Sequence, residues 1–214
     1  LFYWMIIIGL FEMRLRLSLM ISESVWQALT CTFSNMSSDS EGRFLYFAFG
    51  SNLLKQRLQF ENPSASLYIT GRLKDYELKF GFWANNVKSR WHGAVATIEY
   101  CPGAEVWGVI WTMSNQHLST LDEQEGVSRG MYSPLEVSVE TEHGPVLCRT
   151  YKMNNFRPGL PSPQYKKVVC LGAEENGLPA EYLKKLNDIE TNGYNGPSLL
   201  DELKLEKTMK QQKK

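Results

Sequence analysis

The sequence has no excess of charge of either sign. Its 214 residues contain 23 Lys and Arg against 23 Asp and Glu, so the formal net charge is zero. A chain without a basic excess offers no electrostatic reason to bind nucleic acid or an anionic membrane surface. We therefore expect neither nucleic acid nor a membrane among its partners.

Cysteine and histidine are scarce and scattered. The four cysteines, Cys31, Cys101, Cys148 and Cys170, form no C-x-x-C pair, and the three histidines show no metal-ligand spacing with one another or with a cysteine. This pattern fits neither a zinc site nor a dense disulfide framework. We expect free thiols in a reducing compartment, a cytoplasmic location and no metal site.

No hydrophobic run is long enough to cross a bilayer. The strongest run, residues 1–11, is followed by charged residues from Glu12 onward, whereas a spanning helix needs about 20 apolar residues. The positive charges also follow the run, whereas a secretory signal carries them before it. A polar segment opens at Met36, so we expect the working protein to begin there. Residues 1–40 are then a disordered or non-native extension outside the core, with a membrane anchor as the alternative.

Aromatic residues, by contrast, are abundant. Six Trp, ten Tyr and ten Phe indicate a core or pocket rich in rings. The length suffices for one domain with a sizeable core. We expect residues 41–195 to form that domain and the Lys-rich residues 196–214 to form a fraying tail.

Apolar patterning predicts strands over most of the first 150 residues and helices near the ends of the domain. The predicted strands cover residues 44–49, 66–80 (one or two strands, broken at Gly71), 94–100, 105–112, 135–139 and 146–153. The segment Cys101-Pro102-Gly103 predicts a hairpin between the third and fourth of these runs. Helices are expected after residue 52, over 114–124 with Ser114 as N-cap, after Ser162 and Pro163, and from Pro179. The pattern is that of an α+β domain, whose short strands could close into a small barrel.

The sharpest local signal lies where the first strand ends. An apolar run stops at Gly50-Ser51-Asn52, after which Leu54 and Leu58 recur at helical spacing. Gly50 permits a tight turn and a close approach of a ligand to the backbone, and Ser51 or Asn52 can cap the helix. The unpaired N–H groups of such a turn suit a small anion, a carboxylate or a phosphate. Most strand–glycine–helix junctions are nevertheless purely structural.

A second signal is an acidic cluster, Asp122, Glu123 and Glu125, followed by Gly126. The ordinary interpretation is a solvated acidic turn. Carboxylates at a helix C-terminus, however, face an unfavourable dipole, which mildly indicates a function. Glu125 is the member best placed to turn into a cavity, because it precedes the glycine.

Together these two motifs resemble the γ-glutamylcyclotransferase family. The resemblance extends from about residue 44 to about residue 189. The matching segments are Tyr46-Phe47-Ala48-Phe49-Gly50-Ser51-Asn52, Gly108-Val109-Ile110-Trp111, Leu121-Asp122-Glu123-Gln124-Glu125-Gly126-Val127, Gly130-Met131-Tyr132, Cys148-Arg149-Thr150-Tyr151 and Pro161-Ser162-Pro163-Gln164-Tyr165-Lys166-Lys167. The glycine–serine–asparagine loop is shared with glutathione-specific and γ-glutamylamine-specific relatives. The acidic and proline-rich segments point more narrowly to the enzyme of γ-glutamyl amino acids.

The resemblance implies a small closed mixed β-barrel flanked by helices, with a pocket floored by the loop. It implies a lyase that needs no metal or organic cofactor and releases 5-oxoproline and a free amino acid from γ-glutamyl amino acids, as part of glutathione-related metabolism. It also implies a homodimer. Glu125 matches the family's catalytic acid and base. The substrate-binding positions map onto Tyr46, Phe47, Ala48, Phe49, Gly50, Ser51 and Tyr151.

One departure and several alternatives accompany this interpretation. Phe49 stands where the family commonly has Tyr, and the missing hydroxyl would cost about 0.5–1.5 kcal/mol if it donates to the substrate. His92 is considered as a second proton carrier and Arg149 as a carboxylate ligand, beside structural roles for both. The alternative functions are a glutathione-specific or γ-glutamylamine cyclotransferase, or a non-catalytic γ-glutamyl-binding module. Glu125 argues against the last, because simple carboxylate binding would avoid a nearby negative charge.

Overall fold

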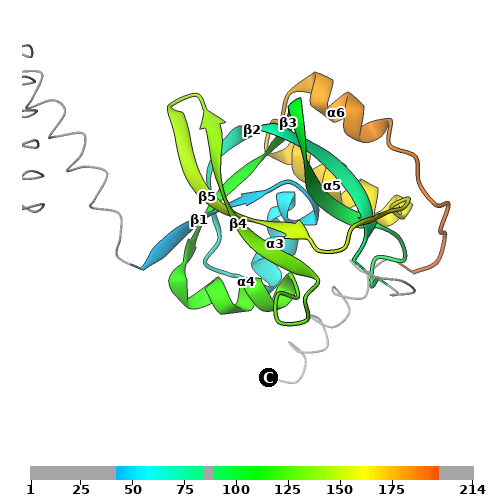
Figure 1. The fold of residues 1–214 in the computed structure, drawn as a ribbon, viewed down its shortest axis with the longest axis horizontal. Helices are drawn as coiled ribbons and strands as arrows, with labels where there is room; N and C mark the ends of the chain where they lie inside the picture. Colours follow the sequence, from blue (N-terminus) through cyan, green and yellow to red (C-terminus); the bar gives the residue numbers. More distant parts are fainter. Residues whose placement is uncertain (1–41, 84–88, 198–214) are drawn as a thin grey trace, which may run out of the picture. The chain divides into compact units, whose positions relative to one another are not determined.

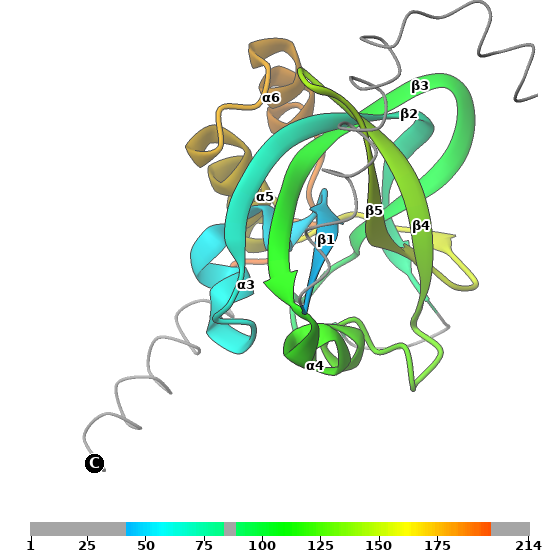
Figure 2. The ribbon, with the colours of Figure 1, turned by 90° about the vertical axis from the view of Figure 1, so that its left-hand side faces the viewer.

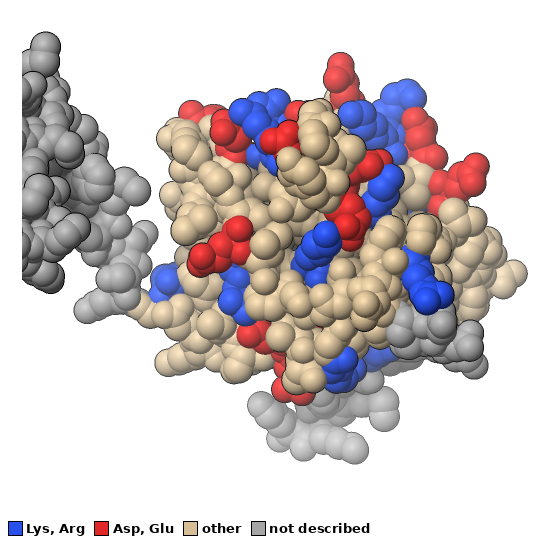
Figure 3. Space-filling model, viewed as in Figure 1, with Lys and Arg blue, Asp and Glu red and all other residues tan. Residues whose placement is uncertain are grey.

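The computed structural model describes residues 42–83 and 89–197. The predicted N-terminal extension and nearly all of the Lys-rich tail lie outside the described residues. Within the described ranges no helix combines the length and the apolarity needed to cross a membrane. On the face drawn in Figure 3, acidic and basic side chains are intermixed, as expected for a chain of zero net charge.

Strands form the centre of the domain and helices surround them. The strands are β1 (Arg43–Ala48), β2 (Ser66–Phe82), β3 (Val95–Ser114), β4 (Tyr132–Thr141), β5 (Gly144–Met153) and β6 (Arg157–Pro158). The helices are α3 (Lys55–Glu61), α4 (Leu118–Gln124), α5 (Pro163–Glu175) and α6 (Ala180–Asn187), with short 3-10 turns η1 (Ser51–Leu53) and η2 (Asn115–His117).

The sheet closes on itself. Its strand order is β3-β1-β5-β4-β2, and β2 pairs with β3 to complete the ring. β1 and β5 run parallel and the other neighbours in the ring antiparallel, so the predicted closed mixed barrel is confirmed. Figure 1 and Figure 2 show α4 across one end of this barrel, with α5 and α6 packed together beside β2 and β3.

The hairpin predicted at Cys101-Pro102-Gly103 is wrong. β3 continues through this segment and pairs with β2 on both sides of it, with Glu105 opposite Lys74 and Tyr100 opposite Tyr76. Residues 101–104 therefore bulge out opposite the single residue Asp75, whose Oδ1 accepts a hydrogen bond from the Gly103 N–H at 2.9 Å. Proline and glycine mark a bulge here instead of a chain reversal. The predicted break at Gly71 is also absent, because Gly71 pairs with Gly108 inside the ladder.

Helix α5 confirms its predicted start and its inward face. The Ser162 hydroxyl accepts a hydrogen bond from the Tyr165 N–H at 3.1 Å, as an N-cap does. Its buried residues include Tyr165, Val168, Val169 and Ala173, as predicted from helical spacing. This face packs on the segment after β1, and the Asn176 amide at the end of the helix donates to the Leu53 carbonyl at 2.9 Å.

The closest approach between α5 and that segment occurs at Gly172. A Cβ atom added there would lie 2.4 Å from the Leu54 backbone nitrogen and 2.5 Å from the Leu53 carbonyl carbon. Backbone atoms cannot rotate away as the end of a side chain can. The glycine is therefore required by packing, although glycine weakens a helix in isolation.

We predict that Gly172→Ala lowers the free energy of unfolding by about 1–3 kcal/mol, because the added methyl overpacks a backbone contact. Helix propensity alone predicts the opposite sign, a gain of about 1 kcal/mol. Urea denaturation of the variant and the wild type distinguishes the two. Glu174→Ala, at an exposed position of the same helix, is the control and should change little. A Gly172→Ala protein as stable as the wild type would contradict the close packing.

Candidate active site

The loop after β1 and the end of α4 meet at a small cavity of about 40 Å³. Its lining residues are Tyr46, Phe49, Gly50, Ser51, Asn52, Ala96, Glu125, Tyr132, Tyr151 and Tyr165. The structure thus brings together Glu125 and five of the seven predicted substrate-binding residues. Phe47 and Ala48 are buried in β1 and do not line this cavity. Their assignment as substrate-binding residues stays a prediction.

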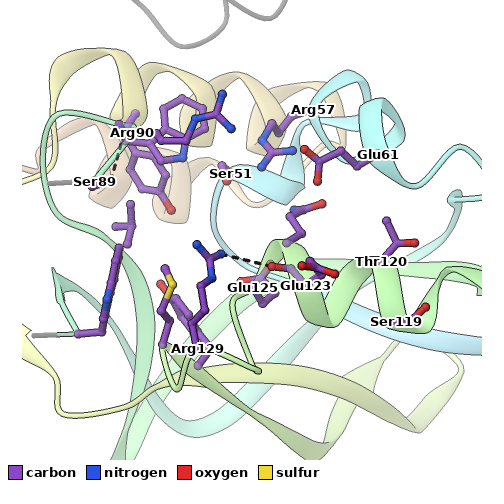
Figure 4. Close-up of a pocket in the computed structure, with 17 residues that line it drawn as sticks. Ser51, Arg57, Glu61, Ser89, Arg90, Ser119, Thr120, Glu123, Glu125 and Arg129 are labelled. Carbon is purple, nitrogen blue, oxygen red and sulfur yellow. Dashed lines mark hydrogen bonds between the residues drawn. The ribbon is translucent and has the colours of Figure 1, made fainter. Parts of the chain in front are cut away.

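This inner cavity adjoins a larger outer cleft of about 710 Å³. Ser51, Glu125, Tyr132 and Tyr165 line both spaces. Figure 4 shows the outer cleft between α3, the segment around Ser89 and Arg90, and the end of α4. Glu125 therefore lies at the junction of a small inner space and a wide outer one.

Gly50 is needed because the chain passes very close to its neighbours. Its φ of −113° lies outside the left-handed region, so a left-handed turn is not the reason for glycine. A Cβ atom at this position would instead approach the Ala96 Cβ to 3.0 Å and the Tyr165 hydroxyl oxygen to 3.1 Å. A larger residue would therefore push the loop away from β3 and α5.

Asn52 does not cap a helix, contrary to the prediction for Ser51 or Asn52. Neither η1 nor α3 has a side-chain cap. The Asn52 side chain is buried, and its Nδ2 donates to the Tyr46 hydroxyl oxygen and to Glu125 Oε1, both at 3.0 Å. The asparagine is thus a site residue that the sequence analysis missed, because its partner Glu125 is 73 positions away.

A chain of side-chain amides fixes the orientation of Asn52. Gln124 Nε2 donates to Asn52 Oδ1 at 3.0 Å, and Asn62 Nδ2 donates to Gln124 Oε1 at 2.9 Å. An amide flip at Asn52 would place two donors against each other and two acceptors against each other. Asn52 therefore presents its N–H groups, and not its oxygen, to Glu125.

The backbone at the end of α4 turns the Glu125 side chain inward. The Glu125 N–H still donates to the Leu121 carbonyl at 3.0 Å, so the residue closes the last turn of the helix. Gly126 then adopts a φ of +68°, and a Cβ atom there would lie 2.5 Å from the Met131 sulfur. Only glycine accommodates both the left-handed conformation and the close contact. The predicted turn of Glu125 into a cavity is confirmed.

Burial raises the pKa of Glu125 to about 7. The positive charge of Arg57 and the hydrogen bond from Asn52 oppose this rise, whereas the negative charges of Asp122 and Glu61 add to it. The desolvation of a carboxylate in a cavity with many aromatic walls is the largest cause, as expected from the composition. Near neutral pH both protonation states of Glu125 are populated, which suits a group that accepts and returns protons.

Four tyrosines, Tyr46, Tyr132, Tyr151 and Tyr165, line the inner cavity. The Tyr165 hydroxyl oxygen accepts a hydrogen bond from the Ala96 N–H at 3.0 Å, and the Tyr132 hydroxyl donates to the Ala96 carbonyl at 2.7 Å. Both rings are therefore core aromatics, as expected, and cavity walls as well. Burial, with the Glu125 charge as a further contribution, raises the pKa of Tyr46 well above its usual range, so its hydroxyl stays protonated.

Comparison with known proteins agrees with this geometry. A sequence model of the AIG2-like family matches residues 105–186. A γ-glutamylcyclotransferase of Bos taurus is 55% identical over 161 residues, covering 75% of this chain and 85% of the relative. The Homo sapiens γ-glutamylcyclotransferase is 50% identical over 163 residues, covering 76% and 87%. The chain belongs to the γ-glutamylcyclotransferase family. A solved γ-glutamyl cyclotransferase structure has the same fold, with a TM-score of 0.73 at 49% identity over 76% of this chain and 98% of that one.

Arg149 lines neither the inner cavity nor the outer cleft. Its Nη2 donates to both carboxylate oxygens of Asp122, at 2.7 and 2.9 Å, and its Nε donates to the Tyr151 hydroxyl oxygen at 3.0 Å. The Tyr151 hydroxyl also donates to Asp122. This cluster joins β5 to α4 one turn before Glu125. Arg149 binds a carboxylate, as considered from the sequence, but the carboxylate belongs to the protein.

His92 lines neither the inner cavity nor the outer cleft. Its ring stacks on Tyr194, with the centroids 4.3 Å apart. These contacts give no support to a second proton carrier at His92. In residues 42–83 and 89–197, no group of three or more His, Cys, Asp or Glu side chains is arranged to hold a metal ion.

We predict that Glu125→Gln stabilises the fold at alkaline pH. The folded-state pKa of about 7 lies above the ordinary value of 4.5. The folded state therefore binds the proton more tightly, and wild-type stability attributable to Glu125 falls as pH rises from about 4.5 through 7. The variant keeps an oxygen for Asn52 and cannot ionise, so it should exceed the wild type by up to about 3 kcal/mol above pH 8. Below pH 4.5 the difference should vanish.

Chemical denaturation at pH 4.5 and pH 8.5 measures this difference. The exposed neighbour Glu123 gives the control, since Glu123→Gln removes the same charge without the burial. A Glu125→Gln gain that is equal at both pH values would contradict a raised pKa.

Proposed function

We propose that this chain catalyses the intramolecular cyclisation of γ-glutamyl amino acids to 5-oxoproline and a free amino acid. Its family membership makes it an enzyme of the cyclotransferase class. One observation carries the proposal for this site. The Glu125 carboxyl, with a pKa of about 7, lines the same cavity as the Gly50-Ser51 loop. The γ-glutamyl group would occupy this cavity.

The reaction requires the α-nitrogen of the substrate to attack its own γ-carbonyl carbon. The attacking nitrogen passes from ammonium to lactam N–H, and the leaving nitrogen passes from amide N–H to ammonium. Two protons therefore move from the first nitrogen to the second as one C–N bond forms and another breaks. A single carboxyl near both nitrogens can accept each proton and return it, and we assign that role to Glu125.

Holding the substrate folded supplies much of the acceleration, because the attack is intramolecular. The candidate donors that line the cavity are the loop backbone at Gly50 and Ser51 and the hydroxyls of Ser51 and Tyr46. The Tyr46 oxygen accepts from Asn52, and its own hydrogen has no acceptor among residues 42–83 and 89–197. We assign these donors to the α-carboxylate or to the oxyanion that forms at the γ-carbonyl.

The proposal also covers the compartment, the metabolic role and the oligomeric state of the protein. Among the described residues Cys101, Cys148 and Cys170 form no disulfide, which supports a reducing compartment such as the cytoplasm. A γ-glutamyl substrate supports a role in glutathione-related metabolism. The homodimer rests on analogy with the family, and light scattering of the purified protein would test it.

We predict that Glu125→Gln lowers kcat by about 10²–10⁴-fold, the usual contribution of general acid–base catalysis. The assay measures 5-oxoproline released from γ-glutamyl-alanine. Glu123→Gln, at the exposed neighbouring carboxylate, should retain activity close to the wild type. Equal turnover by wild type and Glu125→Gln would refute the proton-transfer role. Faster release from glutathione or from ε-linked γ-glutamyl-lysine would favour the other cyclotransferases, and binding without product would favour a non-catalytic module.

We also predict that Asn52→Ala moves the acidic limb of the kcat/KM profile to higher pH. The Asn52 hydrogen bond lowers the pKa of Glu125, so its loss raises that pKa and delays ionisation as pH rises. Asn62→Ala removes only the distant end of the amide chain and should shift the profile less. An unmoved limb in a folded Asn52→Ala protein would show that this bond does not control Glu125.

A further inference from the structure

The outer cleft contains a positively charged side chain that forms no ion pair with any described residue. Arg57 lies on α3 and lines this cleft together with Glu125. Its buried Nε has no hydrogen-bond partner among residues 42–83 and 89–197. Within the described part of the chain, its guanidinium has no carboxylate oxygen within 4.0 Å, not even from Glu61 one helical turn away. A partly buried cation normally has a counterion, because desolvation of an unpaired charge is costly.

Arg149, in the same molecule, is an arginine whose charge is paired with a carboxylate. Arg149 and Arg57 are both partly buried, and Arg149 forms an ion pair with the carboxylate of Asp122. Since no described residue forms this ion pair, the contrast points to a ligand as the anion for Arg57. Its position in the cleft, beside Glu125, indicates that the anion belongs to the substrate.

The dimensions of the two spaces decide which part of the substrate lies near Arg57. Glu125 lines both spaces, so the bond that breaks must lie at their junction. The outer cleft, of about 710 Å³, is far larger than the inner cavity, of about 40 Å³, and is the space with room for a further amino acid. The leaving amino acid therefore extends into the outer cleft. Its α-carboxylate is only two bonds from the leaving nitrogen and must stay near Glu125.

We propose that Arg57 binds the α-carboxylate of the leaving amino acid and selects substrates that carry one at that position. This inference rests on the proposed function. The planar guanidinium can hold a carboxylate through two parallel hydrogen bonds. A γ-glutamyl amine has no such carboxylate, an ε-linked γ-glutamyl-lysine carries it at the far end of a chain, and glutathione has it converted to a peptide bond. Each of these substrates would leave Arg57 unpaired.

Two further arginines reach toward the cleft but differ from Arg57. Figure 4 shows Arg90 and Arg129 approaching the same space from other segments. Both are exposed, and Arg129 Nη2 donates to the Glu123 carbonyl at 3.4 Å. Exposed cations keep their hydration and contribute little to a single ion pair. We therefore assign the carboxylate to Arg57 and use Arg90 as the matched control.

The test compares γ-glutamyl-alanine with γ-glutamyl-alaninamide, which differs only by the loss of the negative charge. We expect Arg57→Gln to lower kcat/KM for γ-glutamyl-alanine by about 10- to 100-fold, the usual effect of losing a hydrogen-bonded charged partner. The same variant should lower the value for the alaninamide much less, so the preference of the enzyme for the carboxylate substrate is lost. Any effect of Arg57 on the protonation of Glu125 acts on both substrates and cancels in the ratio. Arg90→Gln should preserve the wild-type ratio.

Each other outcome overturns the inference in a recognisable way. An equal loss for both substrates would show that Arg57 acts on Glu125 and not on the leaving group. If only Arg90→Gln lost the preference for γ-glutamyl-alanine over the alaninamide, Arg90 and not Arg57 would bind the carboxylate. The wild type alone also provides a test if Arg57→Gln fails to fold. Equal kcat/KM for the two substrates in the wild type would refute the inference. Absence of 5-oxoproline from both substrates would instead refute the proposed function.

Discussion

The hydrogen bond from Asn52 to Glu125 joins two segments that are 73 positions apart, and the chemistry of the site depends on it. Burial alone would keep the carboxyl protonated. One amide donor and the nearby charge of Arg57 offset part of that cost, so the pKa settles near 7. The amide chain through Gln124 prevents Asn52 from flipping. The balance between the two protonation states is therefore built into the fold.

The closed barrel supplies the rigid frame in which this bond has a fixed geometry. Tyr46 on β1 and Tyr151 on β5 line the inner cavity, and their strands are hydrogen-bonded neighbours. The pair of Arg149 and Asp122 then ties α4 to β5, one turn before Glu125. Glu125 is thus positioned from two sides, by the loop in front of it and by its own helix behind it.

The inner cavity and the outer cleft differ in the charged side chains that line them. The inner cavity holds one ionisable carboxyl among tyrosines and backbone N–H groups. The outer cleft adds arginines, of which Arg57 forms no ion pair within 4.0 Å with any described residue, although its charge acts on Glu125. Arg149 and Arg57 are the same residue type, yet one completes the protein framework and the other is left for a ligand. Their difference lies wholly in what the fold places beside them.

Neighbouring residues alone were enough to predict the local features. The apolar run of β1, the Ser162 cap of α5 and the glycine after Glu125 each follow from neighbouring residues, and the two motifs were enough to identify the family, which the comparisons confirm. The remaining features depend on contacts between segments that are distant in the chain. The Pro-Gly segment of β3 became a bulge because β2 continues beside it, and Asn52 became a partner of Glu125 instead of a cap. Hydrogen bonds and ion pairs between distant segments depend on which strands pair, and a local sequence pattern does not specify that pairing.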